Sequence, residues 1–292
     1  MVRLYNTTFK NKVDRSYFLW RYIENPQKDL LISLAIDAGR VVSSYSYSPM
    51  NLRLNETVYK SALAIHLMTH PDYKGLGLSA KLCNLLAPSL AEKGYKMVRG
   101  FPNQISHTFH VQQLGWVDIF EFPTMSRPVT GGMAEDPDVL RDDDFQFDYS
   151  GIIRTPNKIR VDKTTQFMQW RYTQCPTVKY LNYVIASNNR VRAYAVIKKY
   201  DNKINIVDHF YDDAGDMERL LAVISKYAVE QKAEFITTWA NINTGFKIFL
   251  DKQGFQPNLP ITYFGGKLLS DDTPLNYEVK NWDVVMGDDN VY

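Results

Sequence analysis

This 292-residue chain lacks several features that mark particular classes of protein. It has only two cysteines, Cys83 and Cys175, which are too few for a disulfide framework. No uninterrupted apolar run approaches the ~20 residues that a membrane-spanning helix needs. The first residues also lack the long apolar segment of a signal peptide. We therefore expect a protein of the reducing cytoplasm that has no membrane partner.

The chain also lacks a strong charge of either sign. It has 34 Lys and Arg against 32 Asp and Glu, which gives a net charge of +2. A nucleic-acid-binding protein is expected to carry a concentrated basic face, so we expect no nucleic-acid partner. We expect no metal centre either. With 45% hydrophobic and 23% charged residues, the composition is ordinary for a globular protein.

The tripeptide Trp-Arg-Tyr occurs twice, at residues 20–22 and 170–172. A proline follows at the same spacing in both places, as Pro26 and Pro176. Each copy continues with an apolar run, a short polar turn and a second apolar run, which predicts a β-hairpin. The predicted hairpins join 30–36 to 41–47 and 180–186 to 191–197. Self-similarity at this long period indicates duplicated domains rather than a solenoid.

The length agrees with two domains of roughly 100–200 residues each. They are joined by a polar stretch from Pro128 to Ser150 that contains Gly131, Gly132 and several acidic residues. We therefore predict a mixed α/β fold with two tandem domains. The predicted boundaries are residues 1–128 for the first domain, 129–150 for an acidic linker and 151–292 for the second domain.

A glycine-rich loop, Lys-Gly-Leu-Gly-Leu-Ser at residues 74–79, occurs only in the first copy. It lies between a predicted buried strand, 62–69, and a predicted helix that begins near Gly77 and ends at Gly94. Small residues let backbone N–H groups turn toward a ligand, and the start of a helix carries partial positive charge. This arrangement predicts an anion site for phosphate. The alternative is an ordinary tight turn, because short glycine motifs are common.

Residues 69–79 resemble motif A of the GCN5-related N-acetyltransferases (GNAT), which is Q/R-x-x-G-x-G/A after a strand. Lys74 stands at the Arg/Gln place of that motif, Gly77 at the first glycine and Ser79 at the last Gly/Ala. Gly-Phe-Pro-Asn at 100–103, followed by Leu-Gly-Trp at 114–116, is similar to a later motif of the family. The resemblance is close over roughly residues 30–125. The second copy resembles the family only through the order of its predicted strands and helices.

The resemblance implies two tandem GNAT-like domains, with a sheet that splays where acetyl-CoA enters. It also implies the residues that would hold the acetyl-CoA. Backbone groups of Leu67, Met68 and Thr69 would bind the pantetheine arm and the thioester carbonyl. The loop would bind the pyrophosphate, and Asn103 and Phe109 would contact the pantetheine. The loop residues are Lys74, Gly75, Leu76, Gly77, Leu78, Ser79 and Ala80.

The acid and base are harder to assign, because Val111 stands where relatives commonly carry a tyrosine that protonates the thiolate. His107 and His110 lie on the same predicted helix, three residues apart, and either imidazole could serve as acid or base. His66 stands on the strand where relatives often place a carboxylate base, and it is our first candidate. The alternatives are a core role for His66 and a surface role for the other two histidines.

The second copy differs at the place of the phosphate loop. After the strand 204–208, the chain carries a single glycine and the acidic residues Asp212, Asp213 and Asp216. Carboxylates at the start of a helix occupy its positive end and repel phosphate. We therefore predict that the second copy is degenerate and does not bind CoA.

The C-terminal stretch 281–290 combines a tryptophan and apolar residues with three acidic residues. A last strand, or a segment over the substrate cleft, would explain the apolar residues, and the acids could attract a cationic amine. The alternative is a solvated, frayed tail.

Together these features predict an acetyl-CoA-dependent N-acetyltransferase that acts on a primary amine of a small molecule. Amino sugars and nucleotide-linked amino sugars are our candidates for the acceptor. Two alternatives remain. One is an aminoacyl transferase like the FemABX peptidoglycan enzymes, which also use two such domains, and the other is a binding module that senses acyl-CoA without turnover. The sequence does not indicate the oligomeric state.

Overall fold

The computed structural model describes residues 1–131, 135–149, 152, 156–241 and 244–291. Four residues of the predicted linker lie outside the described residues, namely Gly132, Met133, Ala134 and Ser150. The chain divides into two compact units. The first unit comprises Met1–Glu121, Ile159–Asp162 and Tyr263–Asn281, and the second comprises Phe122–Lys158, Lys163–Thr262 and Trp282–Tyr292. We describe each unit by itself.

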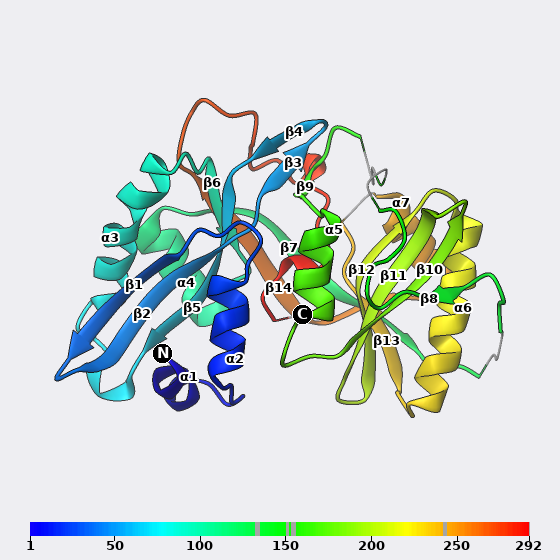
Figure 1. Ribbon diagram of the computed structural model, residues 1–292, viewed down its shortest axis with the longest axis horizontal. Helices are drawn as coiled ribbons and strands as arrows, with labels where there is room; N and C mark the ends of the chain where they lie inside the picture. The colour runs from blue at the N-terminus through cyan, green and yellow to red at the C-terminus, as the bar shows by residue number, and fades with distance from the viewer. Residues whose placement is uncertain (132–134, 150–151, 153–155, 242–243, 292) are drawn as a thin grey trace. The chain divides into compact units, whose positions relative to one another are not determined.

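The first unit is built on a mixed sheet (Figure 1). Four of its strands neighbour one another in the order β1 (Leu31–Asp37), β2 (Arg40–Pro49), β5 (Ser61–Thr69) and β6 (Met97–Gly100). The end of β14 (Gln256–Leu268) follows beyond β6. Only β5 and β6 run parallel, while the other pairs are antiparallel. The predicted hairpin is confirmed by the pairing of β1 with β2.

Helix α3 (Leu78–Glu92) packs against β1 and β2 of this sheet. Its Leu82, Leu86 and Leu90 are buried in one cluster with Tyr45 and Tyr47 of β2. The described part of this unit contains three more α-helices. They are α1 (Val2–Thr8), α2 (Arg15–Phe18) and α4 (Gln104–Leu114). The i, i+4 leucines therefore form the apolar side of α3, as the sequence pattern predicted.

A small second sheet draws a distant piece of the chain into the first unit. Strand β3 (Leu52–Leu54) pairs with β4 (Thr57–Tyr59) and with β9 (Ile159–Val161). The guanidinium of Arg53 binds the carboxylate of Asp162 at 2.7 Å. Residues that follow the predicted linker therefore contribute to the first compact unit.

The second unit also combines parallel and antiparallel strand pairs. Its strands neighbour one another in the order β13 (Phe235–Thr238), β12 (Lys203–Tyr211), β11 (Arg190–Tyr200), β10 (Tyr180–Ser187) and β8 (Leu140–Arg141). The parallel pair is β12 with β13. β13 pairs on its other side with the end of β7 (Val117–Pro128), and the second predicted hairpin is confirmed by β10 and β11.

Two helices follow the strands of this unit, α6 (Ala214–Glu230) and α7 (Gly245–Lys252). Leu220 and Ile224 of α6 are fully buried against apolar residues of β11 and β12, such as Ile197 and Ile206. Both units thus combine a mixed sheet with packed helices. The predicted mixed α/β fold is confirmed.

The two Trp-Arg-Tyr tripeptides have the same local structure. Each lies in a five-residue π-turn, η1 (Leu19–Ile23) and η3 (Gln169–Thr173), which directly follows a four-residue α-helix, α2 or α5 (Thr165–Met168). All six side chains are buried. Arg171 donates hydrogen bonds to the carbonyls of Gly287 and Asp289. These contacts favour a structural role for the tripeptide.

The described residues of the segments predicted as linker and as tail belong to the second unit, except for Asn281. The side chain of Asp142 is buried and accepts a hydrogen bond from the Tyr149 hydroxyl at 2.9 Å. In the C-terminal stretch, Trp282, Val285 and Met286 are buried, and the 3₁₀ turn η5 (Met286–Asp288) replaces the predicted strand. The alternative of a frayed, solvated tail is therefore wrong for residues 282–289, because apolar side chains hold this segment inside the unit.

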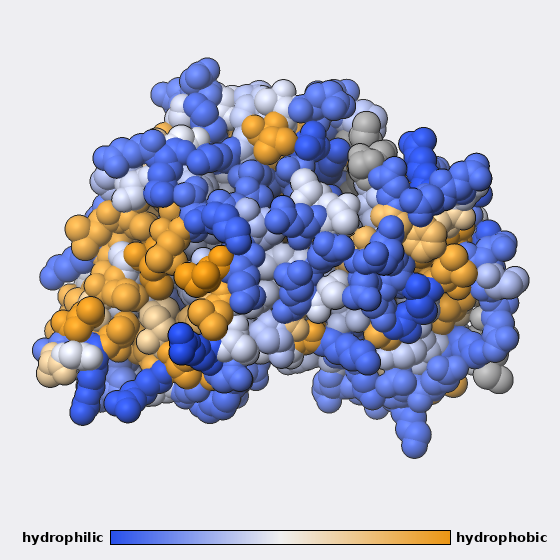
Figure 2. Space-filling model, viewed as in Figure 1, coloured by the Kyte–Doolittle hydropathy of each residue, from blue (hydrophilic) through white to orange (hydrophobic). Residues whose placement is uncertain are grey.

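Apolar side chains gather on one face of the first unit, over β1 and β2 (Figure 2). Leu34 is 39% exposed and Ile36 is 65% exposed on β1, which stands at the end of the strand order. Exposed apolar groups on an edge strand are unusual for a protein surface.

Candidate functional site

The parallel strands β5 and β6 separate part of the way along the first sheet. Their register covers Ser61 to Leu63 of β5 and Met97 to Arg99 of β6, whereas β5 continues to Thr69. At His66 the backbone has a φ of 48°, and the register with β2 shifts between Ser44 and Ser46. An irregular residue of this kind bends a strand. The outer part of β5 therefore presents a backbone edge that β6 does not cover in the described register.

Leu67, Met68 and Thr69, the predicted pantetheine residues, form this outer part of β5. Met68 is fully buried, and its carbonyl accepts a hydrogen bond from the Ser43 hydroxyl at 2.9 Å. Leu67 and Thr69 are partly exposed. An extended ligand can pair with such a backbone edge as an added strand does.

The glycine-rich loop leads directly from this strand into α3. Gly75 has a φ of 79° and Gly77 a φ of 68°, and Gly77 is the N-cap residue that directly precedes α3. Both values lie in the left-handed region that glycine adopts without a steric penalty. Apart from the two neighbouring residues in the chain, a Cβ atom added at either glycine would meet no atom within 4 Å. Side chains therefore do not fill this corner.

The first turn of α3 is a site of positive charge. Its first N–H groups have no partner within the helix, which is general for α-helices, and no side chain among the described residues caps it. Ser79 lies in this turn, and its hydroxyl is 3.4 Å from that of Thr69. The loop residues Lys74 and Leu76 are exposed. The geometry is that of an open anion cradle at a helix N-terminus.

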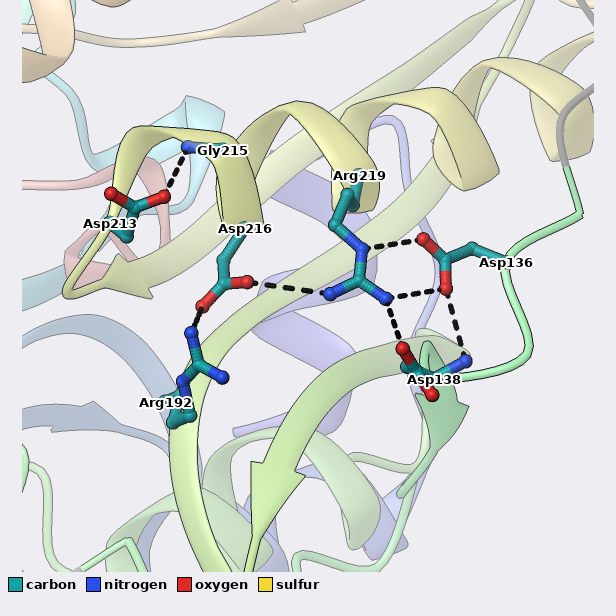
Figure 3. Close-up of polar contacts among 7 residues, drawn as sticks. All are labelled: Asp136, Asp138, Arg192, Asp213, Gly215, Asp216 and Arg219. Carbon is teal, nitrogen blue, oxygen red and sulfur yellow. Dashed lines mark hydrogen bonds and ion pairs between the residues drawn. The ribbon is translucent and has the colours of Figure 1, made fainter.

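The corresponding helix start in the second unit is filled by charged side chains (Figure 3). The carboxylate of Asp213 accepts a hydrogen bond from the Gly215 N–H at 2.8 Å. Asp216, which is 4% exposed, pairs with Arg192 at 2.8 Å and with Arg219 at 3.6 Å. Carboxylates already occupy the positive end of α6, so this helix start offers no comparable anion site.

Arg219 extends this cluster to the segment predicted as linker. Its guanidinium donates to both carboxylate oxygens of Asp136 at 2.6 and 2.7 Å, and to Asp138 at 2.6 Å (Figure 3). A bidentate pair fixes a guanidinium in place. The acidic residues around 136 thus neutralise an arginine of α6.

Asn103 stands at the end of β6 and caps α4. Its side-chain oxygen accepts hydrogen bonds from the Ser106 N–H at 2.9 Å and from the Ser106 hydroxyl at 3.1 Å. Phe109 is partly buried against the core cluster of the first unit. The position of Asn103 agrees with the family motif, but its side-chain oxygen has a structural role that the sequence did not indicate.

His66 is buried between two tyrosines. Its Nε2 lies 2.8 Å from the Tyr17 hydroxyl, and its Nδ1 lies 2.7 Å from the Tyr22 hydroxyl. Burial, together with a smaller effect of the Arg21 charge, lowers the pKa of the imidazole to about 3. A neutral imidazole has one donor and one acceptor nitrogen, so one tyrosine accepts and the other donates. His66 is therefore uncharged at neutral pH, with both nitrogens engaged.

His110 also faces the core. Its Nδ1 lies 2.6 Å from the carbonyl of Ser106, so this nitrogen carries the proton, and its Nε2 accepts from the Tyr45 hydroxyl at 3.1 Å. Burial lowers the pKa of this histidine as well. The ring packs edge-on against Trp116. His110 thus holds α4 against the sheet.

His107 has a different environment on the same helix. Its Nε2 lies 2.8 Å from the carboxylate of Asp118, and its ring stacks on Tyr263 with the centroids 4.1 Å apart. The side chain of His107 is 21% exposed and that of Asp118 is 51% exposed. A carboxylate that orients an imidazole is a common arrangement in acid–base catalysis. The structure therefore separates the two helix histidines, although the sequence places them on one face.

Sequence reasoning missed the partners of all three histidines, among them Tyr17, Tyr22 and Asp118. Tyr22 belongs to the repeated tripeptide, so its recurrence was a usable signal. Tyr17 and Asp118 lie in segments without a motif. Their roles depend on contacts between residues far apart in the chain.

Residues 1–117 match the family model described as an acetyltransferase (GNAT) domain. Over these residues the chain is similar to the GNAT acetyltransferase family. This match supports the predicted enzyme class, an acyltransferase. It includes the outer part of β5, the glycine-rich loop and α4, and so contains all three candidate histidines.

Solved structures of low sequence identity share the fold. A probable N-acyltransferase from Enterococcus faecalis is 12% identical and has a TM-score of 0.66, with 92% of this chain and 69% of that chain covered. A GCN5-related N-acetyltransferase from Anabaena variabilis is 11% identical, with a TM-score of 0.61 and coverages of 92% and 70%.

The Saccharomyces cerevisiae N-myristoyltransferase, solved with bound myristoyl-CoA, is 9% identical and has a TM-score of 0.60. The match covers 91% of this chain and 74% of the yeast chain. No curated protein matches this chain by sequence. Among the residues that the structure describes, no helix is long and apolar enough to cross a membrane.

Proposed function

We propose that the protein is an acyl-CoA-dependent N-acetyltransferase that transfers an acetyl group to a primary amine of a small molecule. One observation carries the proposal. Within the GNAT-like residues, an open helix N-terminus with two left-handed glycines directly follows a strand whose outer backbone edge is not paired with β6. A diphosphate group and an extended amide-containing arm, the two parts of CoA, fit these two features.

In this proposal the pyrophosphate binds the backbone N–H groups of the loop from Lys74 to Ala80. The absence of nearby side chains at Gly75 and Gly77 gives phosphate oxygens the room to reach those groups. The pantetheine arm lies along Leu67, Met68 and Thr69, and Phe109 and the backbone around Asn103 border its path. An N–H group of outer β5 polarises the thioester carbonyl as an oxyanion-hole donor does.

The reaction needs two proton transfers. The amine nitrogen attacks the thioester carbon, a C–N bond forms, and the C–S bond breaks to release the CoA thiolate. One proton leaves the nitrogen of the attacking neutral amine, and one reaches the thiolate. We assign a proton-transfer role to His107, because Asp118 orients its ring and its side chain reaches solvent.

The other two histidines suit this role less well. A base with a pKa of about 3, such as His66, holds almost no proton at neutral pH. His66 would take part only by ordering Tyr17 and Tyr22, and His110 would take part only by positioning α4. Val111, on the same helix, has no proton to give.

We further propose that the second half is a degenerate GNAT-like copy that does not bind CoA. The repeated π-turns, the repeated hairpins and the parallel strand pair in each unit support the duplication. The carboxylates at α6 support the loss of CoA binding.

Amino sugars and nucleotide-linked amino sugars remain the first acceptors to test, and acetyl-CoA is the first donor. Calorimetry should show one acetyl-CoA site per chain, and thiol release should depend on an added amine. Binding without thiol release for any amine in the panel would favour the binding module. The absence of acetyl-CoA binding would contradict the proposed function. Myristoyl-CoA serves as the comparison donor for acyl-chain length.

A further inference from the structure

The second unit contains a cavity of about 390 Å³ that the proposed function does not use. It lies where the parallel strands β12 and β13 separate. Their register covers Lys203 to Asn205 of β12, whereas β12 continues to Tyr211. The ends of both strands, the start of α7 and the segment 282–284 line the cavity.

Two acceptor oxygens line this cavity without a hydrogen-bond partner among the described residues. One is Oδ1 of Asn241, whose residue is 5% exposed, and the other is Oδ2 of Asp283. The amide nitrogen of Asn241 donates to the Trp282 carbonyl, which fixes the orientation of the side chain. A buried acceptor without a donor is destabilising. A ligand that donates N–H groups would satisfy both oxygens.

The rest of the lining is largely aromatic. Trp239, Trp282 and Phe246 border the cavity, and the ring of His209 stacks on Phe246 with the centroids 3.6 Å apart. Aromatic faces attract cations and flat apolar groups. Lys158 also lines the cavity, but it has an interaction of its own and is not a free cation.

From these contacts we propose that the second unit binds a small organic amine with a flat apolar body. The ammonium group donates to Asn241 and Asp283, and the apolar body packs among the aromatic rings. The volume is sufficient, because a cavity of about 150 Å³ already binds benzene. This site is separate from the acyl-CoA cradle, and its occupancy requires no CoA.

Phenethylamine is the probe, and 3-phenylpropionate, which carries a carboxylate on a similar skeleton, is the comparison. Calorimetry with the full chain and no CoA should show saturable binding of the amine at one site. The carboxylate should bind at least tenfold more weakly. Equal binding of both compounds, or binding of neither, would overturn the proposal.

Two variants locate the site. Gly245 lines the cavity and has open space around its Cβ position, so Gly245→Leu should fill the cavity and abolish binding. Gly131→Leu is the matched control, since Gly131 also has open space but does not line the cavity, and it should bind as the native protein does. If Gly245→Leu bound the amine normally, the ligand would lie elsewhere.

Asp283→Asn keeps the shape of the side chain and removes its charge, so it should weaken phenethylamine binding at least tenfold. Unchanged affinity in a folded Asp283→Asn protein would contradict the assignment of the ammonium group. Gly77→Asp, which targets the acyl-CoA cradle, should leave phenethylamine binding intact. The two proposals can therefore fail independently.

Discussion

The starts of α3 and α6 follow equivalent strands in the two units, yet they offer opposite chemistry. At α3 two left-handed glycines leave the backbone N–H groups open. At α6 the carboxylates of Asp213 and Asp216 occupy the same kind of position and are held by a hydrogen bond and ion pairs. In the proposed duplication, a few residues of a single loop give an anion site in one copy and exclude it in the other.

The interiors of the two units differ in a related way. Tyr22 and Tyr172 stand at the same place in the repeated tripeptide. Tyr22 contacts the neutral ring of His66, whereas Tyr172 donates to the buried carboxylate of Asp208 at 2.8 Å. Asp208 is paired with Lys163 at 2.7 Å. The buried partner of this tyrosine is therefore an uncharged imidazole in the first unit and an ion-paired carboxylate in the second.

Placing a carboxylate at the open helix start should have the largest effect. Gly77→Asp introduces a side chain at a φ of 68° and a negative charge next to the phosphates. We expect acetyl-CoA affinity to fall by ~100-fold or more, because the change combines backbone strain with charge repulsion. Calorimetry measures the effect.

The matched change in the second unit is Asp213→Ala, which should leave acetyl-CoA affinity unchanged. Equal losses in the two variants would break the proposed division between the units. Thermal unfolding of both proteins would show that each is folded.

Removing the central cation of the second unit should affect stability rather than CoA binding. Lys163→Met leaves the buried carboxylates of Asp208 and Asp288 without their cation. The free energy of unfolding should fall by about 3–5 kcal/mol, as measured by urea denaturation. In Lys247→Met, which breaks a more exposed pair with Asp251, the loss should stay below about 1 kcal/mol. Similar losses in both variants would argue against a special role for the ionic network.

His107 and His110 allow a comparison within one helix. His107→Gln should lower kcat about 100-fold, since general acid–base catalysis typically contributes that much or more, with little change in acetyl-CoA affinity. His110→Gln should mainly lower the melting temperature, because its ring is part of the core. A His107→Gln enzyme with native kcat would move the proton-transfer role to another group.

His66 in the first unit and Asp289 in the second should change the free energy of unfolding with pH in opposite directions. Burial holds the pKa of His66 at about 3, below its ordinary value, so its contribution is lost as pH falls below about 6.5. Burial raises the pKa of Asp289 to about 6, so its contribution is present at low pH and is lost as pH rises through 6. Each slope is at most about 1.4 kcal/mol per pH unit.

Urea denaturation between pH 4 and 6.5 tests these signs. The stability difference between native protein and His66→Asn should shrink as the pH falls. For Asp289→Asn, the difference should move in favour of the variant as the pH rises. A pH-independent difference in either case would mean that the group does not titrate as described.

Local features were the ones that the sequence predicted well. The hairpins at residues 31–49 and 180–200 and the helix that begins at Leu78 all depend on short-range patterns of apolar residues, turns and glycines. The environments of the histidines were not predictable in the same way. His66 and Tyr17 are 49 residues apart in the chain, and His107 and His110 share a helix but face different neighbours.

The sequence by itself determined the repeated skeleton and the difference between glycines and carboxylates at the two helix starts. Backbone conformation and helix capping depend on a residue and its immediate neighbours. The tertiary structure alone decided that β9 joins the first unit, that the C-terminal segment 282–284 lines a cavity, and that His66 stays neutral. Burial and partner choice depend on contacts between distant residues, and no local pattern records them.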